Sequence, residues 1–245
     1  MNFRTMLFWS CSLALGLMLY ACSAEPPRTP EELLAEAEEL VDWSRYEEGL
    51  ERSKEAQILL LEEAPIDSLL LLRGYFLAAL AAVHIDLDTM DVYADKFFAL
   101  PLRHNKKFAA DSAYLGGILQ VQAANYFEAY QLMELSRSRY WIHDSTDRVI
   151  QAKCLMNKAN IFQIVNQGDS AATNGNLALD LLEGSLPENH PLIGKAHNLR
   201  GLGYMKSNQR WKSEADLRRA LSIFESQLPP NHHEIGYVLN NLGML

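Results

Sequence analysis

The stretch LPENHPLIGKAHNLRGLGYM, residues 186–205, returns in altered form as LPPNHHEIGYVLNNLGML, residues 228–245, at a distance of 42 residues. Six positions are identical in the two copies. Leu186, Pro187, Asn189, His190, Ile193 and Gly194 recur as Leu228, Pro229, Asn231, His232, Ile235 and Gly236. Repetition at a fixed period is typical of a supersecondary unit that stacks on copies of itself. The repeat therefore predicts that one structural unit is built at least twice.

Apolar residues follow helical periodicity from about residue 30 onward, and no segment shows convincing strand-like alternation. Turn-forming residues interrupt this pattern at regular intervals. Interruptions within hairpins fall at residues 42–44, 84–88, 123–126, 166–169 and 208–210, and those between hairpins at residues 65, 101, 141–145, 185–187 and 229–230. The pattern predicts an all-α solenoid of about five helical hairpins plus one unpaired C-terminal helix.

Small residues extend the 42-residue register beyond the two phrases. One series is Ala94, Ser136, Ala178 and Ala220, and a second is Gly117, Ala159, Gly201 and Gly243. Small side chains at fixed positions let two helices approach closely. We therefore expect the same close helix contacts in successive hairpins.

The charge of the chain is negative and concentrated near the N-terminus. The 245 residues carry a formal net charge of -9, and 49% of them are hydrophobic, enough for a sizeable core. Residues 22–65 hold thirteen acidic and four basic side chains, whereas residues 66–245 are close to neutral. Without a basic field to attract phosphates, nucleic-acid binding is excluded.

The N-terminus has the pattern of a secretory signal. Arg4 precedes an apolar run at residues 6–21, which is short for a membrane span. The run ends in Leu19-Tyr20-Ala21-Cys22, which resembles the lipobox of bacterial lipoproteins. The resemblance implies a signal peptide at residues 1–21, lipidation of Cys22 and a proline-rich tether at residues 22–29. It also implies a location in the bacterial cell envelope, at the outer membrane facing the periplasm. An ordinary cleaved signal peptide or an uncleaved anchor are the alternatives.

The segment SRYEEGLERSKEA, residues 44–56, resembles the turn and second helix of a tetratricopeptide (TPR) repeat, with Ser44 and Gly49 in place of the usual Gly and Ala. The two opening phrases are similar to the 42-residue variant of kinesin light chains. The resemblance covers residues 30–245 and implies one TPR-like superhelical domain, with truncation at its C-terminus as an alternative to a complete array. It is weak at residues 67–139, where a different helical repeat is the alternative.

The TPR resemblance implies that the first helix of each hairpin lines a concave, peptide-binding groove. Carried over position by position, the groove residues are Asp111, Tyr114, Ile118, Lys153, Met156, Asn160, Gln163, Lys195, Asn198, Met205, Tyr237 and Asn240. Amide side chains can bind the backbone of an extended peptide, and lysines can meet its carboxylates. We expect Lys195 and Asn198 to be exposed, so that alanine there leaves stability unchanged. The alternative is that these positions form solvated helix faces.

No catalytic or metal-binding constellation is present in the sequence. Histidines lack carboxylate or cysteine partners at ligand spacing, and there is no nucleophile elbow or phosphate-binding loop. Cys154 lies in a helical pattern and is expected to be buried and structural. We therefore expect a non-enzymatic protein without metal or cofactor.

The functional hypothesis is a membrane-anchored TPR adaptor that binds a protein or peptide partner. One alternative is the N-terminal sensor part of a larger protein with a downstream CHAT peptidase-like or signalling domain. A less favoured one is a glycan-binding lipoprotein of the SusD type. The last helix carries Leu239, Leu242 and Leu245 at helical spacing. We expect this apolar stripe to face another chain or a further segment, the alternative being a cap on the fifth hairpin.

Replacement of Cys22 by serine tests the lipid anchor. Because serine cannot form the thioether to lipid, Cys22→Ser should abolish labelling by a palmitate analogue and release the protein from membranes. Equal labelling of the wild type and the variant would exclude a lipid on this residue.

Overall fold

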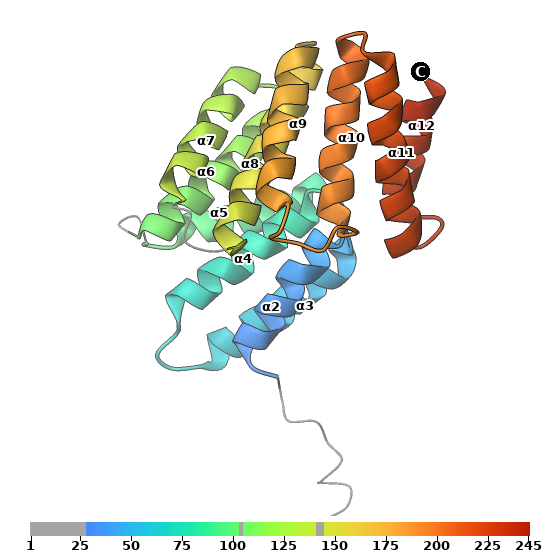
Figure 1. Ribbon diagram of the computed structural model, residues 1–245. Coiled ribbons are helices and arrows are strands. Elements are labelled where there is room, and N and C mark those ends of the chain that lie inside the picture. Colours follow the sequence, from blue (N-terminus) through green and yellow to red (C-terminus); the bar gives the residue numbers. More distant parts are fainter. Residues whose placement is uncertain (1–27, 103–104, 141–144) are drawn as a thin grey trace, which may run out of the picture.

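The computed structural model describes residues 28–102, 105–140 and 145–245, and these residues form helices from end to end (Figure 1). The helices are α2 (Pro30–Asp42), α3 (Tyr46–Glu62), α4 (Ser68–Ala82), α5 (Leu87–Ala99), α6 (Lys106–Gln122), α7 (Tyr126–Arg139), α8 (Ser145–Ile164), α9 (Gly168–Leu182), α10 (Pro191–Lys206), α11 (Arg210–Gln227) and α12 (His233–Gly243). Among the described residues, each predicted interruption falls at or within three residues of the junction between two helices, whereas residues 141–144 lie outside the described part of the chain. The predicted all-α solenoid of five hairpins plus a single last helix is confirmed.

Four of the five hairpins close with the same tight turn. A residue in the left-handed region follows the first helix in each of them: Ser44, Ala124, Asn166 and Asn208, with φ between 58° and 61°. The amide of the residue after it donates to the carbonyl five residues earlier in the chain. After Asn208, for example, the amide of Gln209 donates to the carbonyl of Tyr204 at 2.8 Å. A helix end closed in this way, with a left-handed residue followed by a long backbone hydrogen bond, is a Schellman motif. The last three of these turns lie 42 residues apart, so the sequence period is also a structural period.

The repeated phrase marks the start of a first helix. His190 and His232 are the N-caps of α10 and α12, and their backbones are extended. The Nδ1 atom of His190 accepts from the amide of Leu192 at 3.2 Å, and that of His232 accepts from the amide of Glu234 at 3.3 Å. A helix start leaves amides without partners, so a side-chain acceptor at this position stabilises it. The histidines recur because the helix start recurs.

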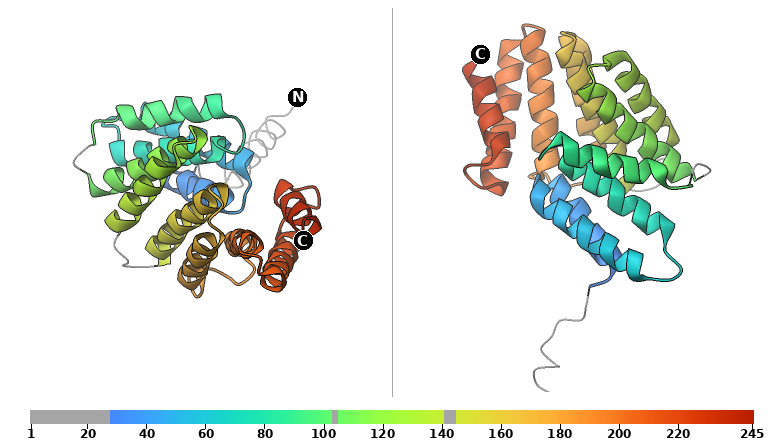
Figure 2. Two further views of the ribbon diagram at one scale, coloured as in Figure 1. Left: turned by 90° about the horizontal axis from the view of Figure 1, so that it is seen from above. Right: turned by 180° about the vertical axis from the view of Figure 1, so that it is seen from behind.

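Neighbouring hairpins stack side by side into a curved array. Each helix packs on the next along most of the chain, and α8 also packs on α10. Seen from above, the array forms an arc that bends around α2 and α3 (Figure 2). The first helices α6, α8 and α10 lie inside this arc, and the second helices α7, α9 and α11 lie outside it. The concave side of the arc is therefore built from first helices.

The small-residue register marks the closest helix contacts. Ala94, Ser136, Ala178 and Ala220 are all buried in second helices. In the first helices a Cβ on Gly117 would lie 2.7 Å from Met133, and one on Gly201 would lie 3.1 Å from Leu217. Gly243 has no neighbour within 4 Å of its Cβ position. The register therefore reflects packing against a second helix, which α12 lacks among the described residues.

The last helix packs on the fifth hairpin with only part of its predicted stripe. Ile235 and Val238 are buried, and Leu242 and Leu245 pack against the same apolar core. Leu239 instead is 51% exposed. The expected continuous stripe of Leu239, Leu242 and Leu245 is wrong, because these residues divide between the packed and the open side of the helix.

The membrane-related predictions concern residues before the described part of the chain. Cys22 and the lipobox lie outside the described residues. Within residues 28–245, apart from the gaps named above, no helix is long and apolar enough to cross a membrane. The described part of the chain begins with a capping box, in which Thr29 and Glu32 cap α2 reciprocally.

Two helical glycines provide a test of the close packing. A Cβ on Gly203 would lie 2.5 Å from the backbone nitrogen of Ala172, whereas one on Gly236 meets nothing within 4 Å. Gly203→Ala should lower the free energy of unfolding by about 1–3 kcal/mol through overpacking. The matched Gly236→Ala should be neutral or stabilise by up to about 1 kcal/mol, because alanine favours helix. Urea unfolding distinguishes them, and equal effects would contradict the close α9–α10 contact.

Candidate functional site: the concave cavity

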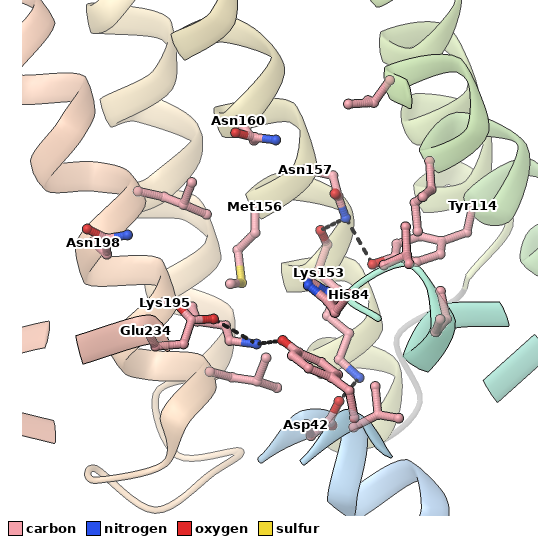
Figure 3. Close-up of a pocket in the computed structure, with 18 of the residues that line it drawn as sticks. Asp42, His84, Tyr114, Lys153, Met156, Asn157, Asn160, Lys195, Asn198 and Glu234 are labelled. Carbon is pink, nitrogen blue, oxygen red and sulfur yellow. Dashed lines mark hydrogen bonds and ion pairs between the residues drawn. The ribbon is translucent and has the colours of Figure 1, made fainter. Parts of the chain in front are cut away.

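The first helices surround a cavity of about 560 Å³ on the concave side of the arc (Figure 3). Side chains from α4, α6, α8, α10 and α12 line it. The α2–α3 turn, residues 42–46, also borders the cavity, although it belongs to the first hairpin. The prediction that first helices line a concave surface is confirmed.

Two lysines at the α2–α3 end of the cavity are held by ionic and polar contacts. Lys153 of α8 forms an ion pair with Asp42 at the end of α2. Lys195 of α10 donates to the hydroxyl of Tyr46 at 2.7 Å, and its Nζ lies 3.5 Å from a carboxylate oxygen of Glu234 on α12. Both lysines are mostly buried, with side chains 16% exposed. The turn thus joins two repeats that are distant in sequence.

These contacts leave the cavity close to electrically neutral. Burial by itself would lower the pKa of Lys195, but Tyr46 and Glu234 favour the charged form and raise its pKa above the ordinary value. Lys195 is therefore charged at every physiological pH. Each of the two lysines is matched by one carboxylate, that of Asp42 or that of Glu234. A ligand that relies on a free cation finds none in this pair.

Aromatic and histidine rings make further contacts with the α2–α3 turn. We call the groups that contact this turn its seat. The Tyr46 ring stacks on His84 with centroids 3.9 Å apart, and the Trp43 ring meets His190 edge-on at 5.1 Å. The Nε2 atom of His232 lies 3.1 Å from the carbonyl oxygen of Ser44. Since the Nδ1 atom of His232 accepts from an amide, Nε2 carries the proton and donates to Ser44.

Two carboxamides in the cavity retain hydrogen-bonding capacity. Asn160 of α8 has no side-chain hydrogen bond to any described residue, and it points into the cavity (Figure 3). Asn198 of α10 accepts from Asn241 at 3.0 Å, while its own amide donors have no partner among the described residues. Met156 lies between these helices as an apolar surface. The upper part of the cavity therefore combines free amides with apolar side chains.

The structure brings most of the predicted groove residues together. Those that line the cavity are Tyr114, Ile118, Lys153, Met156, Asn160, Lys195, Asn198 and Tyr237. Their part in binding stays a prediction. The expectation that Lys195 is an exposed position is wrong, because it is buried between Tyr46 and Glu234.

Four predicted groove residues lie outside this cavity. Asp111 is 1% exposed, accepts from the Tyr140 hydroxyl and borders a separate small cavity. Burial raises its pKa, although Lys107 opposes the shift. Gln163 donates to the carbonyl of Leu199 at 2.8 Å and so ties α8 to α10.

The other two lie near the C-terminal end. Met205 packs against the apolar core of the last hairpins. Asn240 is exposed, and its neighbour Asn241 makes the contact to Asn198. The predicted position is thus one residue off at Asn240, although Tyr237 of the same helix lines the cavity as predicted, and one residue rotates a side chain by about 100° around a helix.

Sequence reasoning missed several cavity residues. Asp42 and Tyr46 belong to the first hairpin, and no local pattern indicates that their turn meets α8 and α10. Glu234 lies three residues before Tyr237, one helical turn away, so helical spacing could have found it. Asn157, whose amide donates to the Tyr114 hydroxyl at 2.9 Å, follows Met156 and could not be distinguished from an outward position.

Cys154, expected to be structural, lies in the packed interior of α8. Cys154 is fully buried, as predicted, and burial raises its pKa to about 11. Among the described residues there is no group of three histidine, cysteine or acidic side chains that could hold a metal ion.

Comparison with known proteins identifies a fold but not a family. No model of a known protein family matches the sequence, and no curated protein does. The structure is similar to the crystal structure of the apo form of RapI, with a TM-score of 0.52 and 14% sequence identity, over 88% of this chain and 70% of that one. The fold is that of a TPR-like helical repeat protein.

The pKa of His190 makes the seat of the turn sensitive to acid. Its ring is buried, which lowers its pKa; Asp42 opposes this shift, and Lys153 and Lys195 add to it. The pKa of a histidine in an unfolded chain is about 6.5. The unfolded chain therefore takes up the proton first, and the stability that neutral His190 contributes is present above that pH and lost as the pH falls further.

Substitution of His190 by asparagine tests this dependence. Asparagine keeps a capping oxygen but takes up no proton in this range. Between about pH 7.5 and about pH 5 the wild type should lose more unfolding free energy than His190→Asn, by at most about 2 kcal/mol. Urea unfolding at both pH values measures the difference. An equal loss in both proteins would show that His190 does not titrate as inferred.

Proposed function

We propose that the protein is an interaction scaffold that binds an extended segment of a partner protein in its concave cavity. The observation that carries this proposal is the pair of available carboxamides, Asn160 on α8 and Asn198 on α10, in a cavity with an apolar surface. A carboxamide offers both donors and acceptors, as the peptide backbone does. Successive first helices repeat such groups along the groove, which suits an extended chain.

The charge distribution favours recognition of the backbone over recognition of a free charge. Lys153 and Lys195 are already paired with Asp42 and Glu234. The same pairing supports a non-enzymatic role, because the two lysines and the two carboxylates stabilise one another in their charged forms.

We also propose that the scaffold is held at a membrane of the bacterial cell envelope by lipid on Cys22. The support is the lipobox pattern ending at Cys22 and the proline-rich segment that follows it. The 42-residue spacing of the left-handed turns at Ala124, Asn166 and Asn208 supports assignment to the kinesin-light-chain-like type of TPR repeat.

Peptide selection on the folded protein tests the binding proposal. Peptides selected from a random library on the full chain should lose affinity about three- to tenfold with Asn160→Ala or Asn198→Ala, since each substitution removes hydrogen bonds to the backbone. Asn240→Ala is the matched control, because it removes the same side chain from an exposed position outside the cavity. Fluorescence anisotropy measures the dissociation constants.

The outcome against the proposal is equally definite. Peptides that bind all three variants with wild-type affinity do not occupy the concave cavity. Equal losses from Asn160→Ala and from Arg218→Ala on the exposed side of α11 would also show that the two faces are not distinguished.

A further inference from the structure

The α2–α3 turn occupies the concave face in the manner of a ligand. It contacts side chains that lie far away in sequence: Lys195 is 149 residues from Tyr46, and His232 is 188 residues from Ser44. In the view from above, α2 and α3 lie within the arc formed by the later hairpins (Figure 2). The turn therefore fills space that an open solenoid would leave to a partner.

Each contact group of the turn has a counterpart on a different repeat. The carboxylate of Asp42 pairs with Lys153 of α8. The hydroxyl of Tyr46 accepts from Lys195 of α10 at 2.7 Å. These are side-chain contacts of the kind that a bound peptide makes, spread over neighbouring first helices.

Two further contacts involve the helix caps. The Ser44 carbonyl accepts from the N-cap of α12, His232, and the Trp43 ring lies against the N-cap of α10, His190. Both caps belong to the repeated phrase. The turn thus contacts equivalent positions in two consecutive repeats.

Apart from the edge-on contact of the Trp43 ring with His190, the turn contacts these helices through polar groups, and the contact is small. The helix pairs that pack closely include α2 with α3 and α3 with α4, but neither α2 with α8 nor α3 with α10. Separating an apolar interface exposes its surface to water, whereas polar groups recover hydrogen bonds from water when they separate. The turn can therefore leave by breaking these contacts and the Tyr46–His84 ring stack, while α3 stays packed on α4.

We propose that the partner of the concave face is a protein segment with the chemistry of this turn, a carboxylate followed about four residues later by a tyrosine, and that it binds by displacing the turn. The inference rests on the proposed peptide-binding function. It names the class of segment that matches Lys153 and Lys195, which carry their positive charges at a fixed separation on two rigid helices.

A peptide copy of the turn is the direct probe. The peptide LVDWSRYEE, residues 40–48, carries a fluorescent label and is added to the full chain. In the wild type it competes with the intramolecular turn, which has the advantage of a high effective concentration. In the variant Asp42→Asn/Tyr46→Phe the shape of the turn is kept, but its carboxylate and hydroxyl are lost. The variant should therefore bind the peptide about tenfold or more tightly than the wild type does.

The controls separate specific binding from unspecific opening. A peptide with asparagine and phenylalanine in place of its aspartate and tyrosine should bind the variant no more tightly than it binds the wild type. Adding Lys153→Met to the variant should also abolish its increased affinity for LVDWSRYEE, whereas adding Arg218→Ala, on the exposed side of α11, should leave that affinity unchanged. Far-UV circular dichroism and thermal melting confirm that each variant folds.

A measurement on the unsubstituted chain gives a second test. With saturating LVDWSRYEE peptide, amide hydrogen exchange should become faster within residues 42–46 and slower on α8 and α10. Unchanged exchange in the turn would mean that no displacement occurs, and it would overturn the proposal even if the double variant failed to fold.

The outcomes also separate this inference from the proposed function. If selected peptides depend on Asn160 and Asn198 but LVDWSRYEE binds neither protein, the scaffold function stands and the turn-like partner is wrong. If LVDWSRYEE binds the variant but no selected peptide depends on those asparagines, the reverse holds. Self-association of the variant without peptide binding would assign the seat to a second copy of the chain and overturn the proposal.

Discussion

Each helical hairpin of this protein has to bury its apolar surface against the next one, and the rest of the structure follows from that constraint. The small residues of the 42-residue register allow the close approach, as the narrow space between Gly117 and Met133 shows. Left-handed turns at Ala124, Asn166 and Asn208 return the chain at the same angle in three consecutive hairpins. Repetition of one contact geometry then generates a curved array, because a small rotation between neighbours accumulates along a solenoid.

The curvature separates two kinds of surface. Side chains between hairpins are apolar and close-packed, so they supply most of the stability. Side chains on the concave side combine apolar residues such as Met156 and Ile118 with polar ones: Asn160, Asn198 and the paired lysines Lys153 and Lys195. A surface of this kind contributes little to folding, and it is free to serve recognition.

The turn of the first hairpin occupies part of the concave face. The turn pairs Asp42 with Lys153, which would otherwise be a mostly buried charge without that carboxylate, and it adds the Tyr46 hydroxyl to the Glu234 carboxylate that faces Lys195. The turn is thus held on the concave face by polar bonds and by the ring contacts of Trp43 and Tyr46.

The sequence by itself determined the helices, their hairpin pairing and the repeat period, because caps, turns and small residues act within a few residues of where they stand. His190 and His232 cap helices locally, and the resemblance to TPR repeats implied that the first helices line the concave side. Only the tertiary structure decided that Asp42 meets Lys153, that Tyr46 meets Lys195, and that Asn241 rather than Asn240 faces α10. Those contacts depend on the summed rotation of successive hairpins and on the exact roll of each helix, and a roll of one residue moves a side chain by about 100°. No pattern within a single repeat encodes that sum, so the fold could be predicted from the sequence while the seat of the first turn could not.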